Sequence, residues 1–224
     1  MTRKTKISRR EFGRKMGLSA AGLALLQPHT LLAGGVTPKQ VEGPFYPDSD
    51  MGDNDLDLTH IQGHTESATG EHIFVHGQVR DIEGNPLANA TVDIWQANDA
   101  GRYRHAEDPN PAPLDPNFQG WGIVQTDAEG YYRFKTIKPG AYSLSFLGGD
   151  GWRARHIHYK VSHADHQPLT TNLYFPGDPL IEQDLEIVKA PEEDRWMLMS
   201  VLEEPHASGL DIYRFDVVLA ASAA

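Results

Sequence analysis

The chain has 224 residues, 39% of them hydrophobic, with 31 acidic residues against 20 basic ones and no cysteine. This length allows one substantial hydrophobic core, so we expect a single catalytic or binding domain rather than several. The 21 glycines and 15 prolines punctuate short segments and form no repeat or low-complexity tract. The lack of cysteine excludes disulfides and iron–sulfur clusters held by thiolates.

Residues 1–33 carry the pattern of an export signal. Arg9 and Arg10 precede a short, mildly apolar run from Gly17 to Leu26, which predicts a twin-arginine signal and a periplasmic or secreted protein. The run is too short for a membrane span, which needs about 20 residues, although an uncleaved signal anchor stays open. We expect no membrane association once the signal is removed.

The charge of the remaining chain excludes some partners. Without residues 1–33, which hold seven Lys or Arg and one Glu, 13 basic and 30 acidic residues remain, a net charge near −17. Such a negative field disfavours binding to nucleic acid or to anionic membranes. An anionic substrate must meet local positive charge, which Arg102, Arg104, Arg153 and Arg155 could supply.

Residues 34–71 are interpreted as an N-terminal arm, and residues 72–224 as short strands that predict an all-β fold, a β-sandwich. Hairpins are expected to join Ile73–Asp81 to Ala90–Gln96, and Gly122–Thr126 to Tyr131–Thr136, because turn residues lie between the members of each pair. Further strands are expected at Tyr142–Leu147, Arg155–Ser162, Leu169–Phe175 and Tyr213–Leu219, with a turn or two of helix in residues 178–188 and 192–201.

The most informative segment is Trp152–Tyr159, which alternates like a strand and sets His156 and His158 two residues apart. Side chains at i and i+2 leave the same face of a strand, so both imidazoles can bind one ion. A metal ion needs more than two such ligands, and Tyr103 and Tyr142 upstream could supply them. Two phenols with two imidazoles suggest ferric iron. A phenol with a pKa of about 10 ionises at neutral pH only beside a strong positive charge, whereas zinc or Cu(I) would more naturally recruit thiolates.

Each part of this pattern has a simpler interpretation when it is taken alone. Two strand histidines are often hydrogen-bonded or exposed rather than ligating, and tyrosines such as Tyr103 and Tyr142 are typical of the edge of a core. His105, two residues after Tyr103, is the rival ligand. We rank it below His156 and His158 and expect it to lie behind the ligands.

A resemblance that covers most of the chain favours the metal site. Its motifs occur in order between residue 42 and about residue 218: Glu42–Tyr46, Gly77–Asp81 with Gly84–Pro86, Ala90–Ala97, Gly101–Tyr103, Ala112–Phe118, Thr126–Tyr132, Ile137–Tyr142, Trp152–Tyr159 and Tyr174–Leu180. Together they resemble the intradiol ring-cleavage dioxygenases, especially the iron-bearing subunit of the protocatechuate 3,4-dioxygenase type. The resemblance implies a β-sandwich with long active-site loops and non-haem Fe(III) as the cofactor.

The resemblance also implies roles for single residues. Tyr103 is expected to be the phenolate that stays on the iron, Tyr142 the phenolate that leaves when substrate binds, and His156 and His158 the imidazole ligands. Arg153 matches an arginine that lies over the substrate ring. The implied reaction inserts both atoms of O2 between the hydroxyl-bearing carbons of a catechol-type substrate and gives a muconate-type diacid.

Two departures from the family concern the surroundings of the metal. After Tyr142 the chain has Leu144 and Ser145, where protocatechuate enzymes typically have an aromatic and a basic residue, and Asn172 stands where the family usually has glutamine. Residues 144–151 are expected to form a flexible active-site loop. We expect Leu144 and Asn172 to border the site, and the aromatic substrate stays open.

Two other functions and the state of assembly also stay open. An exported β-sandwich binding module would keep the fold without catalysis, although related subunits that lack iron also lose the ligands, and all four are present here. A hydrolytic or structural zinc protein would use His156 and His158. The chain has no long helical N-terminal segment of the kind that pairs catechol 1,2-dioxygenases, so we expect a homo-oligomer or an assembly of the protocatechuate type.

The export signal gives the first testable prediction. Replacing both arginines, Arg9→Lys with Arg10→Lys, should leave uncleaved protein in the cytoplasm, because the twin-arginine route reads the arginine pair itself and not only its charge. Cell fractionation and the mass of the purified chain measure this. A double variant that still reaches the periplasm would show that another route exports the protein.

Overall fold

Strands make up most of the regular structure between residues 72 and 219. The computed structural model describes residues 35–48 and 55–222, so the predicted export signal lies outside the described part. The longer strands are β1 (His72–Asp81), β2 (Thr91–Trp95), β3 (Trp121–Gln125), β4 (Tyr131–Ile137), β7 (His156–Ser162), β8 (Leu169–Tyr174), β10 (Asp211–Arg214) and β11 (Val217–Leu219). The short ones are β5 (Tyr142–Ser143), β6 (Trp152–Arg153) and β9 (Val201–Leu202).

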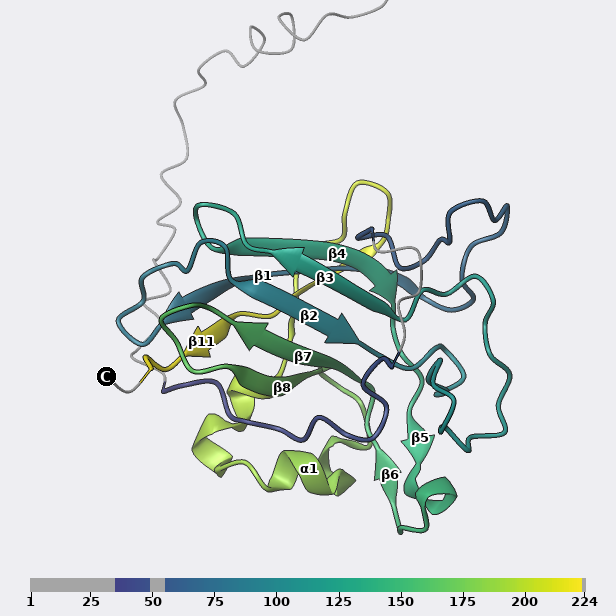
Figure 1. The fold of residues 1–224 in the computed structure, drawn as a ribbon. Coiled ribbons are helices and arrows are strands. Elements are labelled where there is room, and N and C mark those ends of the chain that lie inside the picture. Colours follow the sequence, from purple (N-terminus) through teal and green to yellow (C-terminus); the bar gives the residue numbers. More distant parts are fainter. Residues whose placement is uncertain (1–34, 49–54, 223–224) are drawn as a thin grey trace, which may run out of the picture. The chain divides into compact units, whose positions relative to one another are not determined.

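The strands form two main sheets and a separate ribbon (Figure 1). One sheet has the order β11-β1-β10-β9, with β4 also paired to β1; the other has the order β3-β2-β7-β8; and β5 pairs with β6. One apolar cluster takes Val75 from the first sheet and Ile94 and Tyr159 from the second, so the core lies between the two sheets. The predicted all-β sandwich is confirmed.

Both predicted hairpins are wrong. β1 pairs with β4, β10 and β11, whereas β2 pairs with β3 and β7, so the turns at residues 83–86 and 127–130 carry the chain from one sheet to the other. Turn residues signal a reversal of the chain, and alternation signals one buried face. Neither signal says which strand becomes the hydrogen-bonded neighbour, and in a sandwich both sheets offer a buried face.

Two of the expected strands differ in the structure: one ends early and the other is divided. After β5 the chain turns into the 3₁₀ helix η2 (Leu144–Leu147), which Ser143 caps and which ends at Gly148 with a φ of 76°. The segment 213–219 divides into β10 and β11, and Phe215 lies between them. A Cβ on Gly77 of β1 would lie 1.7 Å from the carbonyl oxygen of Phe215, so glycine is needed where the chain passes β1.

The expected helical turns are present and follow β8 in the chain. They are η3 (Ile181–Gln183), α1 (Leu185–Val188) and η4 (Glu192–Leu198). Residues of α1, η4 and β8 share a second buried cluster that includes Tyr174, Ile187 and Leu198. In the described residues, no helix is long and apolar enough to cross a membrane.

The N-terminal arm runs along the edge strand β8 and then past the ends of β7 and β2 (Figure 1, purple). The backbone N–H of Gln40 donates to the carbonyl of Thr170 in β8 at 2.9 Å. Further along the arm, the Tyr46 hydroxyl donates to Asp93 of β2 at 2.6 Å. Of the side chains that point away from the core, Asp93 and Trp95 of β2 and His156 and His158 of β7 are buried, whereas Ser162 at the far end of β7 is exposed.

Candidate metal centre

Three donor atoms converge on the outer face of β7. Since Ile157, Tyr159 and Val161 face the core, His156 and His158 share the opposite face. The Nε2 atom of His156 lies 3.2 Å from Nε2 of His158 and 3.3 Å from the Tyr103 hydroxyl, which is 3.0 Å from Nε2 of His158. Two ligands at about 2.1 Å from one ion, at angles of about 90 to 110°, lie about 3.0 to 3.4 Å apart. These spacings fit one metal ion.

Tyr142 supplies a fourth donor beside this trio. Its ring centroid lies 5.7 Å from that of Tyr103 and 5.8 Å from that of His156. The two tyrosines come from different loops, which meet at Gly101, where φ is 77° and a Cβ would lie 2.5 Å from the carbonyl oxygen of Ala141. The glycine before Tyr103 thus allows the backbone preceding Tyr142 to approach.

The backbone fixes which nitrogen of His156 can bind a metal. Nδ1 of His156 lies 2.6 Å from the carbonyl oxygen of Ala154. A carbonyl can only accept, so Nδ1 carries the proton and Nε2 presents its lone pair to Tyr103 and His158. The ring of His158 is held differently: it stacks on Trp95 with centroids 4.7 Å apart and planes 4° from parallel.

Burial decides the charge of all four donors. It lowers the pKa of His156 and His158 well below the ordinary value, and the positive charge of Arg153 lowers both pKa values further. Both imidazoles are therefore neutral, the form that binds metals. Burial also raises the pKa of Tyr103 well above its ordinary value and raises that of Tyr142, against the opposing effect of Arg153.

This donor set selects a hard, highly charged ion. Phenols that are buried and hard to ionise become phenolates only beside a strong Lewis acid. In residues 35–48 and 55–222, no group of three or more His, Cys, Asp or Glu side chains could hold a metal ion. The two tyrosines are thus needed to complete a site around His156 and His158, and the residues present fit a ferric ion.

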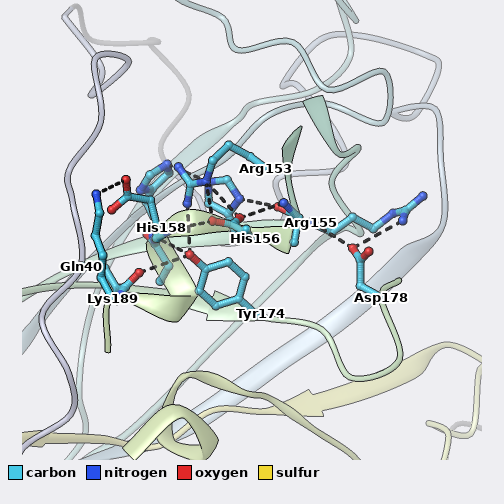
Figure 2. Close-up of polar contacts among 12 residues, drawn as sticks. Gln40, Arg153, Arg155, His156, His158, Tyr174, Asp178 and Lys189 are labelled. Carbon is cyan, nitrogen blue, oxygen red and sulfur yellow. Dashed lines mark hydrogen bonds and ion pairs between the residues drawn. The ribbon is translucent and has the colours of Figure 1, made fainter. Parts of the chain in front are cut away.

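Arg153 is held rigidly next to the donors (Figure 2). Its Nε lies 3.2 and 3.0 Å from the two carboxylate oxygens of Asp184, and its Nη2 donates to the Tyr174 hydroxyl at 3.0 Å. Tyr174 in turn donates to Gln40 of the arm at 3.3 Å. In register, Arg153 of β6 lies opposite Tyr142 of β5, so the guanidinium belongs to the same site.

The remaining predicted residues surround the donors without joining them. The ring of His105 packs on Phe45, at 5.6 Å between centroids, and Phe45 packs on Tyr103 at 5.1 Å. Leu144 packs against the apolar cluster that contains both tyrosines. Asn172 of β8 is the register partner of His158.

Three of the four nearby arginines have partners elsewhere. Arg102 donates to the carbonyl of Ala112 at 2.6 Å, and Arg104 to the carbonyl of Asp115 at 2.9 Å. Arg155 extends to Asp178, with 3.5 Å between Nη1 and Oδ2 (Figure 2).

Sequence reasoning missed the residues that hold Arg153 and His158: Gln40, Trp95, Tyr174 and Asp184. Trp95 and Tyr174 lie within the quoted motifs, but nothing in the sequence assigns them a partner. Asp184 lies 31 residues after Arg153 in a segment with helical character, and no local pattern joins the two. The pair forms because Asp184, the residue that caps the start of α1, lies against Arg153 of β6 in the folded chain.

The Arg153–Asp184 pair gives a stability prediction. Asp184 has no exposed side-chain area and also accepts from the backbone N–H groups of Ala154 and Glu186. Asp184→Asn should lower the free energy of unfolding by about 3 to 5 kcal/mol, because it leaves a buried guanidinium without its counter-charge. Denaturant unfolding measures the loss.

Glu186→Gln is the matched control for this change. It removes a carboxylate from the same segment, but from an ion pair with Lys189, whose side chain is 63% exposed. Its cost should stay below about 1 kcal/mol. Equal losses in the two variants would show that Asp184 does not neutralise Arg153.

Comparisons with known proteins show the family of the chain. The family profile Dioxygenase_C, described as Dioxygenase, matches residues 41–221. The protocatechuate 3,4-dioxygenase beta chain of Burkholderia cepacia is 46% identical over 183 residues, which cover 79% of this chain and 76% of that protein. Catechol 1,2-dioxygenase 2 of Acinetobacter lwoffii is 33% identical, over 76% of this chain and 66% of that protein.

A solved structure shows the same fold. The dioxygenase domain of a carbohydrate-binding fusion protein from Streptomyces sp. SirexAA-E is 28% identical, with a TM-score of 0.63 over 84% of this chain and 100% of that domain. The match to several curated catechol 1,2-dioxygenases spans only about half of their length. From the profile match and the two sequence relatives, the chain belongs to the intradiol ring-cleavage dioxygenases, O2-dependent oxidoreductases that act on catechol-type aromatics.

Proposed function

We propose that this protein is a non-haem Fe(III) enzyme in which Tyr103, Tyr142, His156 and His158 hold the iron. The convergence of Tyr103, His156 and His158 within 3.0 to 3.3 Å carries this proposal, because buried neutral imidazoles and phenols have little reason to meet without a cation. A binding module without catalysis gains no support, since all four donors are present and the relatives bear the names of enzymes.

The proposed reaction inserts O2 between the two hydroxyl-bearing carbons of a catechol and gives a muconate-type diacid. When bound, Fe(III) would supply a Lewis acid that lowers the pKa of the catechol hydroxyls. Tyr142 then takes up a proton from the incoming catechol at its phenolic oxygen. Arg153 stabilises the negative charge on the ring oxygen as the adjacent ring carbon becomes ketone-like.

The different anchoring of the two tyrosines supports their different roles. The backbone N–H of Tyr103 donates to Asp108 at 2.7 Å, and the Tyr103 ring is packed against Phe45. Tyr142 instead belongs to the short β5–β6 ribbon, which lies outside both main sheets (Figure 1). Tyr103 is therefore suited to stay in place and Tyr142 to move.

We also propose that the protein leaves the cytoplasm by the twin-arginine route. This route carries folded proteins, which suits an enzyme whose metal donors come together only in the folded state. Iron would then be bound in the cytoplasm before export, and the cell controls which metal is offered there.

Iron content and colour test the proposed metal site. The protein purified after iron-replete expression should hold close to one iron per chain and be burgundy, because phenolate-to-Fe(III) charge transfer absorbs visible light. Tyr103→Phe should remove much of the colour and most of the oxygen uptake, whereas His105→Ala should keep its iron. Elemental analysis and visible spectra decide this. A colourless wild type without iron contradicts the ligand assignment, and zinc in its place would support the hydrolytic or structural alternative.

Substrate preference follows from the uncharged side chains that come after Tyr142 in the chain. Leu144 packs against the tyrosines, and Ser145 bonds to Ser143, so neither offers a charge to a ring carboxylate. A carboxylate without a charged partner loses hydration without compensation. We expect a higher kcat/KM for a neutral catechol than for protocatechuate, measured by oxygen uptake.

The three arginines with partners elsewhere define the opposite outcome. If protocatechuate is preferred and this preference disappears on mutating Arg102, Arg104 or Arg155, that arginine leaves its present partner to bind the carboxylate. Lys substitutions at the same positions serve as controls, since they keep the charge but not the fork of donors.

A further inference from the structure

Two paired residues of β7 and β8 each carry a buried polar atom without a hydrogen bond. Within the described part of the chain, Nδ1 of His158 and Oδ1 of Asn172 are both buried and have no hydrogen-bond partner. The two residues are register partners in adjacent strands, with exposed fractions of 2% and 0%. Buried polar atoms are nearly always paired, so an unpaired donor beside an unpaired acceptor needs an explanation.

The orientation of the Asn172 amide follows from Tyr174. The Tyr174 hydroxyl gives its proton to Gln40 and accepts from Nη2 of Arg153 at 3.0 Å. Its remaining capacity is to accept, so the amide group that meets it at 3.3 Å is the Nδ2 donor of Asn172. The carbonyl oxygen of Asn172 is therefore the atom left over, and it can only accept.

The proton on His158 follows from its other nitrogen. Nε2 of His158 lies near the Tyr103 hydroxyl and near Nε2 of His156, which also presents a lone pair. If Nε2 is a metal ligand, the neutral ring carries its proton on Nδ1, which then requires an acceptor.

We propose that Asn172 is a positioning residue that accepts the Nδ1 proton of His158, and so fixes the tautomer of this ligand and strengthens its donation to the metal. This inference rests on the proposed iron site. His156 is held differently, because its Nδ1 proton is accepted by the main-chain carbonyl of Ala154. A side-chain substitution cannot remove that acceptor. His158 is therefore the imidazole whose donor strength a single side chain can tune.

Two substitutions test the proposal in opposite directions. Asn172→Leu removes the acceptor, so His158 should become a weaker donor, the charge-transfer band should move to longer wavelength, and iron affinity should fall by about 10- to 100-fold. Asn172→Asp supplies a stronger, charged acceptor, which should move the band to shorter wavelength and lower the Fe(III)/Fe(II) reduction potential. Visible spectra, potentiometry and iron release to a chelator measure these changes in the purified, full-length protein.

Thr171→Val is the matched control. Thr171 is the neighbour of Asn172 in β8, is equally buried, and loses one hydrogen bond, to the carbonyl of Pro38, on substitution. It should leave the band unchanged, even if β8 is destabilised. Asn172→Gln, which keeps an amide acceptor, should leave the band close to that of the wild type.

The outcomes separate this inference from the proposed function. Opposite shifts for Asn172→Leu and Asn172→Asp support it; shifts in the same direction, or no shift beyond that of Thr171→Val, overturn it and leave Asn172 as packing. Should Asn172→Leu fail to fold, the nearly isosteric Asn172→Asp still decides. An iron-free wild type overturns the proposed function itself, whatever the variants show.

Discussion

The proposed metal site depends on keeping its four candidate donors, Tyr103, Tyr142, His156 and His158, uncharged and buried. β7 supplies two of them from one face because alternate residues of a strand point the same way, while Ile157 and Tyr159 on the other face bind this strand to the core. An outer sheet face would normally be wet. Here the arm lies against the end of this face that carries His158, where a Cβ on Gly43 would lie 3.5 Å from the imidazole ring. Burial shifts the imidazoles toward their neutral form and the phenols away from ionisation. The ligands are thus prepared for a cation strong enough to deprotonate tyrosine.

One buried ion pair sets the electrostatics of this site. Arg153 brings a positive charge close to His156, His158 and both tyrosines. Burial is the main cause that lowers the pKa of the imidazoles, and this charge lowers it further; for the phenols the same charge opposes the rise in pKa caused by burial. Such a charge is costly to bury, and Asp184 offsets it from the start of α1. The helical segment after β8 therefore belongs to the chemistry of the centre, although it contributes no donor.

The sequence was sufficient for the parts of the molecule that obey short-range rules. Alternation along residues 155–162 predicted both β7 and the shared face of His156 and His158, and the structure brings them together with Tyr103. Long-range partners were beyond such rules. The hairpins failed because turn residues do not identify a strand's neighbour, and the Arg153–Asp184 pair was missed because it joins elements that meet only after folding. The division of residues 142–147 into β5 and a 3₁₀ helix reflects the Ser143 cap, which looks like an ordinary strand residue in sequence.

The attachment of the arm also limits how the chain can be processed. The backbone N–H of Thr37 donates to Val218 of β11 at 3.1 Å, and its hydroxyl accepts from the backbone N–H of Val218 at 2.9 Å. A protease needs its substrate extended and free of such bonds. Cutting beyond Thr37 in the folded protein would mean peeling away the segment that leads to Gly43 and Phe45 over the donors. If the proposed export signal is removed from the folded protein, the cut is expected ahead of Thr37, so the segment over the proposed metal site stays in place.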